Sequence, residues 1–166
     1  MAARSTLTIK IQGEQDPPTP YTEKVRHTPI NINKSLLAGV LTDTFDSLYA
    51  VDTAALGTSA TVSHDLQTAT DRFGVALTLT DVALIYVEHM ADSTASSISL
   101  SANASNGFTN LLGAAAAVTL APGDFFLVGA LTADNLVVSG TNKVFDVTND
   151  DGSNTAHYVM HVWGRK

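Results

Sequence analysis

Apolar and polar residues alternate along several short segments of the chain, and this period of two limits its fold more than any other feature. Residues 6–12, 30–33 and 97–102 each place an apolar side chain at every second position, with polar residues between. Successive side chains of a β-strand point to opposite faces of the sheet. These segments are therefore predicted to be strands with one buried face and one solvated face.

Four continuous apolar runs form a second class of predicted strand. They cover residues 82–87, 125–128, 136–138 and 158–163. Strands of this kind suit positions that are covered on both faces or that lie at a contact between subunits.

Turn-forming residues separate these segments at short intervals. Residues 16–20 contain three prolines, which cannot donate to a strand ladder. Further reversals are predicted at Asn106-Gly107 and at residues 121–124, 139–142 and 149–152.

The best helical candidate is residues 35–41, which carry a cluster of apolar side chains. Gly39 and the Thr-Asp-Thr run after residue 41 should keep this segment short or make it a strand. Short strands with turns every eight to twelve residues or so are typical of a β-sandwich or barrel. We therefore predict an all-β fold.

The amino-acid composition excludes several classes of protein. The 166 residues are enough for one compact unit with its own core. A chain that is 45% hydrophobic and 15% charged does not have the low hydrophobicity and high charge of a disordered protein. The absence of cysteine excludes a disulfide framework, a thiol nucleophile and a thiolate metal site. Stability must therefore come from packing, backbone pairing or association.

Charge is distributed unevenly along the chain. The net charge is −7, which makes nucleic acid an unexpected partner because such binding depends on Lys and Arg neutralising phosphates. Residues 1–34 nevertheless hold five bases and three acids, whereas residues 35–164 hold two bases and thirteen acids. The acidity could serve solubility alone. Alternatively, the N-terminal strands dock on an acidic or polar partner while the body faces solvent.

No membrane or targeting segment is predicted. Residues 5–12 alternate instead of forming the continuous apolar stretch of a signal. The longest apolar run, residues 111–131, is interrupted by Pro122, Gly123 and Asp124, so a pair of strands with a turn explains it better than a membrane span. We expect a soluble protein.

The most suggestive metal-binding spacing is that of His157 and His161. On a helix the two imidazoles would share a face, but the zinc motif of this spacing also needs a Glu beside the first His, and Tyr158 stands there. On a strand they would lie roughly 13 Å apart at about 3.3 Å per residue. We therefore expect two half-buried strand histidines.

Residues 146–157 resemble a calcium loop only in part. Asp151 replaces the required glycine and His157 the required glutamate. A looser ion site at residues 149–151 and a hairpin turn both remain open, and the turn is the simpler explanation. The sequence has no nucleophile elbow, phosphate loop or dinucleotide fingerprint. We predict no catalytic residue, no metal, no cofactor, no small-molecule substrate and no enzymatic activity.

The aromatic residues offer no clear sugar-binding platform. Most lie within strand runs, where core packing is the default expectation: Phe125, Phe126, Phe145, Tyr158 and Trp163. Trp163 is the exception, because it lies three residues from the end of the chain. It could cover the edge of the core or contact a neighbouring subunit.

From about Ser47 onward the order of segments has a recognisable pattern. A threonine- and serine-rich segment is followed by a buried run, VALIYVEH, then by a serine-alternating strand and a hairpin with Pro-Gly at its turn, and two strands complete the chain. These segments are residues 57–63, 82–89, 97–101, 118–127, 144–149 and 157–164. In this order they resemble the head decoration (cement) proteins of tailed bacteriophages and related small jelly-roll virion proteins.

The resemblance implies a jelly-roll-like antiparallel β-sandwich preceded by an N-terminal β-hairpin or arm. We expect the arm to span residues 1–34 and the body to span residues 35–166. Such proteins typically sit as homotrimers on the exterior of the capsid, after synthesis in the host cytoplasm, and bridge copies of the major capsid protein. The predicted capsid contacts are the basic N-terminal residues, and the predicted oligomer contact is Trp163. The basic residues are Lys10, Lys24, Arg26 and Lys34.

Two other functions stay open. A tail, baseplate or head-fibre component that binds a host glycan would need an exposed cluster of aromatic and carboxylate side chains on one rim. A jelly-roll enzyme would need several histidines and a carboxylate to converge in the barrel, and the body offers His64, His89, His157 and His161.

Overall fold

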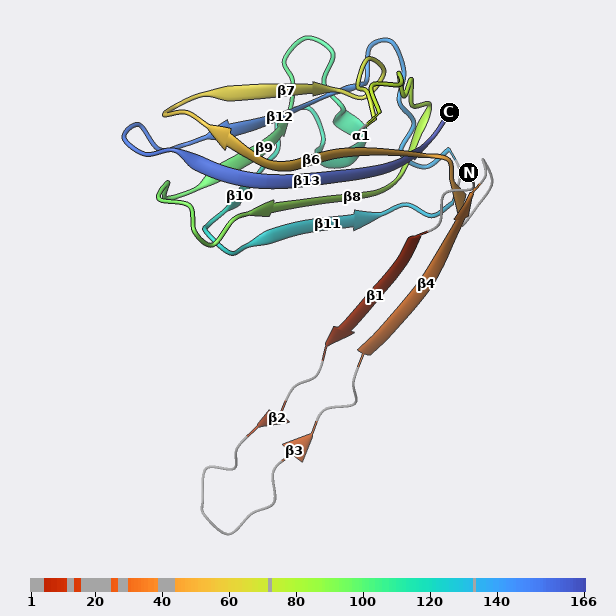
Figure 1. Ribbon diagram of the computed structural model, residues 1–166, viewed down its shortest axis with the longest axis horizontal. Coiled ribbons are helices and arrows are strands. Elements are labelled where there is room, and N and C mark those ends of the chain that lie inside the picture. Colours follow the sequence, from red (N-terminus) through yellow and green to blue (C-terminus); the bar gives the residue numbers. More distant parts are fainter. Residues whose placement is uncertain are drawn as a thin grey trace.

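The protein is an antiparallel β-sandwich with a two-stranded ribbon attached to it (Figure 1). The structure is a computed structural model that describes residues 5–11, 14–15, 25–26, 30–38, 44–71, 73–132 and 134–166. Within these residues the one α-helix is a single turn, α1 (Thr109–Leu112), and no helix is long and apolar enough to cross a membrane. The all-β sandwich predicted from the sequence is confirmed.

Eight strands build the sandwich. They are β6 (Ser47–Leu56), β7 (Thr61–Asp65), β8 (Asp81–His89), β9 (Ile98–Ala102), β10 (Ala117–Leu120), β11 (Phe125–Gly129), β12 (Val144–Asn149) and β13 (Ala156–Arg165). One sheet has the order β11-β8-β13-β6 and the other β10-β9-β12-β7. Consecutive strands thus pass repeatedly from one sheet to the other, an order consistent with a jelly roll of two Greek keys.

The core forms where the inner faces of the two sheets meet. Along β13 buried and half-buried residues alternate, with Tyr158, Met160 and Val162 buried inside. Phe145 of β12 is buried in the same core. The alternation predicted for residues 97–102 is borne out in β9, where Ile98 and Leu100 are buried and Ser99 is not, whereas the run at residues 158–163 is fully buried on one face only. The run at residues 82–87 is covered on both faces, also as predicted, apart from the half-buried Tyr86.

Two segments differ from the sequence-based predictions, and a third decides between two alternatives that the sequence left open. Residues 136–138 were predicted as a strand, but Val137 makes only an isolated bridge with Asp81, and the backbone hydrogen bonds of this segment with β8 and Thr80 stop at Leu136 and Val138. For residues 35–41 a short helix or a strand was expected, and residues 35–38 belong to the strand β4 (Ile30–Ala38), while residues 39–41 lie outside the described residues. The long strand β6 was not predicted, since its sequence, SLYAVDTAAL, has neither strict alternation nor a continuous apolar run.

The N-terminal strands form the ribbon that Figure 1 shows leaving the sandwich. β1 (Ser5–Ile11) pairs antiparallel with β4 (Ile30–Ala38), and β2 (Glu14–Gln15) pairs with β3 (Val25–Arg26) farther out. The predicted N-terminal hairpin is thus present, and the boundary placed after residue 34 falls within β4. β5 (Thr44–Phe45) pairs with the end of β4 and leads into the sandwich.

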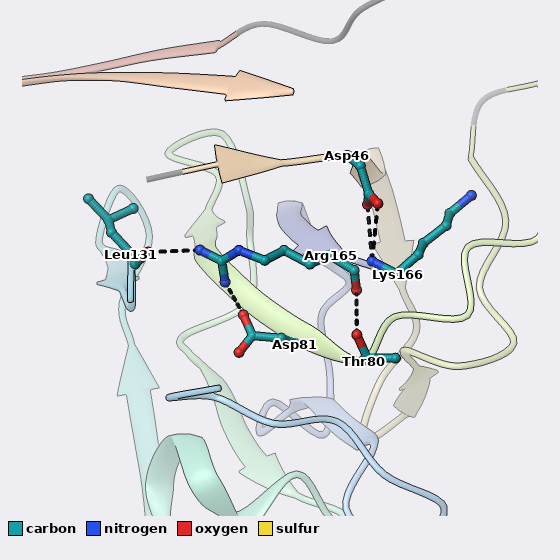
Figure 2. A network of polar contacts seen from close by, with 6 residues as sticks. All are labelled: Asp46, Thr80, Asp81, Leu131, Arg165 and Lys166. Atoms are coloured by element: carbon teal, nitrogen blue, oxygen red, sulfur yellow. Dashed lines mark hydrogen bonds and ion pairs between the residues drawn. The ribbon is translucent and has the colours of Figure 1, made fainter. Parts of the chain in front are cut away.

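A polar network fixes the point where the ribbon meets the sandwich (Figure 2). The buried guanidinium of Arg165, at the end of β13, pairs with the carboxylate of Asp81 and donates a hydrogen bond of 2.8 Å to the carbonyl of Leu131. The backbone N–H of Lys166 donates to Asp46 at 3.1 Å. Phe45, next to Asp46, is buried against Leu84. The chain entering from the ribbon is therefore held to the end of β13.

We predict that Asp81→Ala destabilises the fold by about 3–5 kcal/mol, because it leaves a buried guanidinium without its carboxylate. Denaturant unfolding of the variant measures the effect. Asp46→Ala, at the exposed end of the same network, should cost only about 1 kcal/mol. Replacing both members of the buried pair by apolar residues, Asp81→Leu with Arg165→Met, should cost less than Asp81→Ala. Equal losses for Asp81→Ala and Asp46→Ala would contradict this account.

Candidate functional site

Aromatic rings gather on the outer face of the sheet β11-β8-β13-β6. Tyr86 lies between Phe125 and His161, with ring centroids 6.0 Å and 6.5 Å apart, and His161 meets Trp163 at 5.7 Å. The register explains this row, because His161 stands directly opposite Tyr86 and opposite residues of paired strands share a face. Three strands thus contribute to one aromatic surface.

A cleft of about 790 Å³ lies between this surface and β1. Its lining residues are Thr8, Ile9 and Lys10 of β1, Leu84 and Tyr86 of β8, Phe125, Phe126 and Leu127 of β11, and Trp163 of β13. Phe125 leaves 61% of its surface exposed, although a large apolar side chain gains stability from burial. The cleft therefore offers apolar surface to a binding partner.

Carboxylates border this apolar surface. The hydroxyl of Tyr86 donates to Oε2 of Glu88 at 2.5 Å, and burial, together with this hydrogen bond, raises the pKa of Tyr86 to about 12. Nε2 of His161 lies 3.1 Å from Oδ1 of Asp52. The phenol therefore stays protonated near neutral pH. Among the described residues that line the cleft the charged one is Lys10, and Glu88 and Asp52 are bonded to rings of the aromatic surface.

The predicted site residues fall into two groups. Lys10 is exposed in β1 and lines the cleft together with the half-buried Trp163. Arg26 stands opposite Glu14 between β3 and β2, and Lys34 lies within β4. Lys24 lies outside the described residues. Lys10 and Trp163 thus line the same cleft, whereas Arg26 and Lys34 lie along the ribbon, in β3 and β4.

Sequence reasoning missed the aromatic surface itself. The default placement of Phe125 in the core is wrong, because this residue begins the edge strand β11 and its side chain faces outward beside Glu88. The core placement is confirmed for Phe145 and Tyr158, each 1% exposed. The Pro-Gly-Asp turn immediately before Phe125 predicted a reversal there, but it did not show that the following strand lies at the edge of its sheet.

The outer face of the other sheet has a different chemistry. Asp146 of β12 accepts hydrogen bonds from the hydroxyl of Ser63 at 2.6 Å and from the amide of Asn103. Thr61 and Thr148 join their hydroxyls at 2.9 Å across β7 and β12. This surface consists of small polar groups that satisfy one another, and it resembles an ordinary solvated face.

The four histidines do not converge. His157 and His161 are half-buried on the outer face of β13, which confirms the prediction of two strand histidines. His64 and His89 are buried, and His89 bonds through Nδ1 to the carbonyl of Leu120 at 3.0 Å. Within the residues that the structure describes, no group of three or more His, Asp or Glu side chains could hold a metal ion.

Residues 150–155, which belong to the segment that partly resembles a calcium loop, connect β12 to β13. The carboxylate of Asp151 accepts hydrogen bonds from the backbone N–H groups of Ser153, Ser96 and Asn154. These bonds, led by that from Ser153, lower the pKa of Asp151 to about 2. The amide of Asn149 donates to the carbonyl of Gly57 at 3.0 Å. The segment is thus a tight connection, but the expected hairpin is wrong, because β12 and β13 belong to different sheets and the chain crosses between them here.

His64 lies inside the sandwich between two tyrosines. The hydroxyl of Tyr49 is 2.8 Å from its Nδ1 and that of Tyr158 is 2.9 Å from its Nε2. A neutral imidazole has one donor and one acceptor nitrogen, so it can donate to one hydroxyl and accept from the other. Burial lowers the pKa of His64 to about 4, although the carboxylate of Asp146 acts in the opposite direction.

We predict that this histidine makes the fold acid-sensitive. Between pH 6.5 and about 4 the unfolded chain binds a proton that the folded protein does not, so stability falls as the pH falls through this window. The full loss is on the order of 3 kcal/mol. Denaturant unfolding at several pH values measures it. His64→Gln, which keeps a donor and an acceptor but does not titrate, should show a shallower pH dependence, and an unchanged slope would contradict the assignment.

Comparison with known proteins adds no relative: no family model, curated protein or solved structure matches this chain. Its function must therefore be inferred from its geometry and its sequence.

Proposed function

We propose that this protein is a structural component of a bacteriophage virion that binds the outside of the capsid as a homotrimer. In this role it bridges neighbouring copies of the major capsid protein and stabilises the head without catalysing a reaction. The observation that carries the proposal is the ribbon of β1–β4, which leaves the sandwich and carries Lys10, Arg26 and Lys34. The resemblance of the sequence to cement proteins supports the same function.

The ribbon is suited to contact a partner because it is poorly stabilised by itself. A lone two-stranded hairpin is at best marginally stable in water, and Figure 1 shows β2 and β3 lying beyond the sandwich. A binding partner that covers the ribbon would supply the missing contacts. The described residues of the ribbon include three basic residues and one acidic residue, Glu14, so an acidic or polar surface is the expected complement.

The outer faces of the two sheets differ in chemistry, and this difference supports a location in which the hydroxyl-rich face points away from the capsid. The face with Ser63, Asp146 and Thr148 is already satisfied by its own hydrogen bonds. The opposite face has the aromatic cleft and the start of the ribbon. We therefore assign the ribbon and the cleft to partner contacts and the hydroxyl-rich face to solvent. The acidic body would be repelled by packaged DNA, in keeping with the exterior of the head.

The proposed mechanism is multivalent. A trimer that engages several capsid subunits holds each weak contact at a high effective concentration of the others. All contacts on a subunit must then break before that subunit can leave the shell. Such a clamp slows rupture and thus raises the kinetic stability of the head.

We expect a molar mass of three times 17.4 kDa in solution, and saturable binding of the protein to undecorated heads of the virus that encodes it. Arg26→Glu combined with Lys34→Glu should weaken head binding at least tenfold, because the basic ribbon faces the shell. Light scattering measures the mass, and co-sedimentation with heads measures binding. Arg26→Lys combined with Lys34→Arg, which keeps both charges, is the control and should bind heads as the wild type does. A monomer that does not bind heads, or an image of the particle in which the ribbon faces solvent, would contradict the proposal.

A second candidate is a tail, baseplate or head-fibre component that binds a host glycan. The observation that favours it is the row of rings, half-buried except for the exposed Phe125, with two carboxylates next to it: Phe125 stands beside Glu88 and His161 beside Asp52. Such a protein would show saturable binding to a sugar on a glycan array, and Phe125→Ala would abolish this binding. An array without a binder would exclude this candidate.

A further inference from the structure

We propose that the cleft between β1 and the aromatic surface takes an extended segment of another protein, which adds a strand to the open edge of β11. The segment has apolar residues at alternate positions and a carboxylate that faces Lys10. This inference goes beyond the proposed function, because it defines the secondary structure and the chemistry of the occupant whichever protein supplies it.

The backbone of β11 has one free side. β11 is the last strand of its sheet and pairs with β8 (Figure 1). Backbone hydrogen bonds to β8 flank the strand at Asp124 and Ala130, at 3.0 Å and 2.8 Å. Because bonded pairs alternate with non-bonded pairs in an antiparallel ladder, the even-numbered residues between these two also bond to β8. The N–H and C=O groups of Phe125, Leu127 and Gly129 therefore point away from the sheet.

These free backbone groups select a strand as the occupant. Within the part of the chain that the structure describes, no other segment pairs with this side of β11. The free N–H and C=O groups of an edge strand are a template for a further strand. Recognition by strand addition uses such main-chain pairing for affinity and side-chain pockets for specificity. A lipid or a small apolar molecule in the cleft would leave these backbone groups to water.

The other edge strands of the sandwich are less suited to this role. β6 and β7 contain Asp52 and Asp65, and a charge on an edge strand discourages further pairing. β10 is the remaining edge, and none of its residues lines the cleft. β1, which forms the opposite wall of the cleft, is itself the last strand of its own sheet. The cleft thus lies between two strands that each have an unpaired side.

The walls of the cleft define the side chains of the segment. A strand paired with β11 lies about 4.8 Å from it and places every second side chain on the aromatic face, beside Phe125 and Leu127, which line the cleft. Apolar side chains fit there, because they cover the ring of Phe125, which is 61% exposed. Among the described lining residues the charged one is Lys10, and its complement is a carboxylate. The cleft volume of about 790 Å³ falls within the usual range of ligand-binding pockets.

The first test selects peptides from a display library of random short sequences against the full chain. We expect the selected peptides to carry apolar residues at every second position and Asp or Glu near one end, and to show saturable binding when they are synthesised. Trp163 is the only tryptophan and lines the cleft, so its fluorescence should shift to shorter wavelength on binding. A library that yields no peptide, or only peptides without this period of two, would overturn the inference.

The second test asks whether the backbone of a selected peptide pairs with β11. Two versions of the peptide keep all side chains and carry N-methyl groups on either the odd-numbered or the even-numbered backbone nitrogens. One of these sets faces β11, so we expect one version to bind about tenfold more weakly, or worse, and the other to bind like the parent peptide. Equal affinities of the two versions would show a ligand held by its side chains alone and would overturn strand addition.

The third test changes the protein. Gly129→Pro removes a backbone donor on the free side of β11 and leaves the ladder with β8 intact, so the variant should fold and bind the peptide about tenfold more weakly. Lys10→Glu should weaken binding, whereas Lys10→Arg keeps the charge and the affinity. Phe125→Ala should lose the peptide, and Phe73→Ala, at a residue that is 90% exposed and outside the cleft, is its control. Wild-type affinity in Gly129→Pro and Lys10→Glu would overturn the inference.

Two further outcomes would assign the cleft to another occupant and so overturn the inference. Self-association of the wild type that Gly129→Pro abolishes would place a second copy there. A glycan signal that Phe125→Ala abolishes and Gly129→Pro keeps would place a sugar there. Binding to heads is measured separately from peptide binding, so the failure of this inference and the failure of the proposed function are distinguishable.

Discussion

The central pairing of β13 holds this molecule together. The strand is hydrogen-bonded to β6 on one side and to β8 on the other, and its alternating side chains serve both faces of the sheet. Tyr158, Met160 and Val162 pack in the core, whereas His161 and Trp163 join the aromatic surface. Because successive side chains of a strand point to opposite faces, the residue order of β13 that places three side chains in the core also places His161 and Trp163 on the aromatic surface. A shift of β13 by one residue would therefore change both the core and the aromatic surface.

The end of the same strand fixes the ribbon. Arg165 is buried with Asp81, and the adjoining Lys166 is bonded through its backbone to Asp46. A buried charged pair contributes little net stability but is costly to break. Its value here is positional, since it ties the last residues of the chain to the segment that enters from β5. The ribbon and the cleft consequently keep a defined relation to each other.

Much of the fold follows from local sequence patterns, whereas the candidate site depends on contacts between distant segments. Alternation at residues 97–102, the apolar run at residues 125–128 and the Pro-Gly turn were sufficient to predict β9, β11 and the reversal between β10 and β11. The expected hairpin there is wrong, because these two strands belong to different sheets. The strand β6 was missed because its burial depends on pairing with β13, which its own pattern does not reveal. The exposure of Phe125 was missed for a similar reason. The hydrophobicity of a segment predicts that it forms a strand within a sheet. Whether that strand lies at the edge of the sheet depends on the topology of the whole fold.

That edge position also bears on the association proposed for this chain. The sheet with the aromatic surface ends in β6 on one side and in β11 on the other. β6 contains Asp52, but β11, with the sequence FFLVG, has neither a charge nor a proline. Natural sheets usually protect such an edge with charge, proline, a bulge or a covering segment. In this protein the unprotected strand borders the cleft, so an occupant of the cleft could cover both the exposed ring of Phe125 and the edge beside it. Edge protection and partner binding would then be two consequences of one contact.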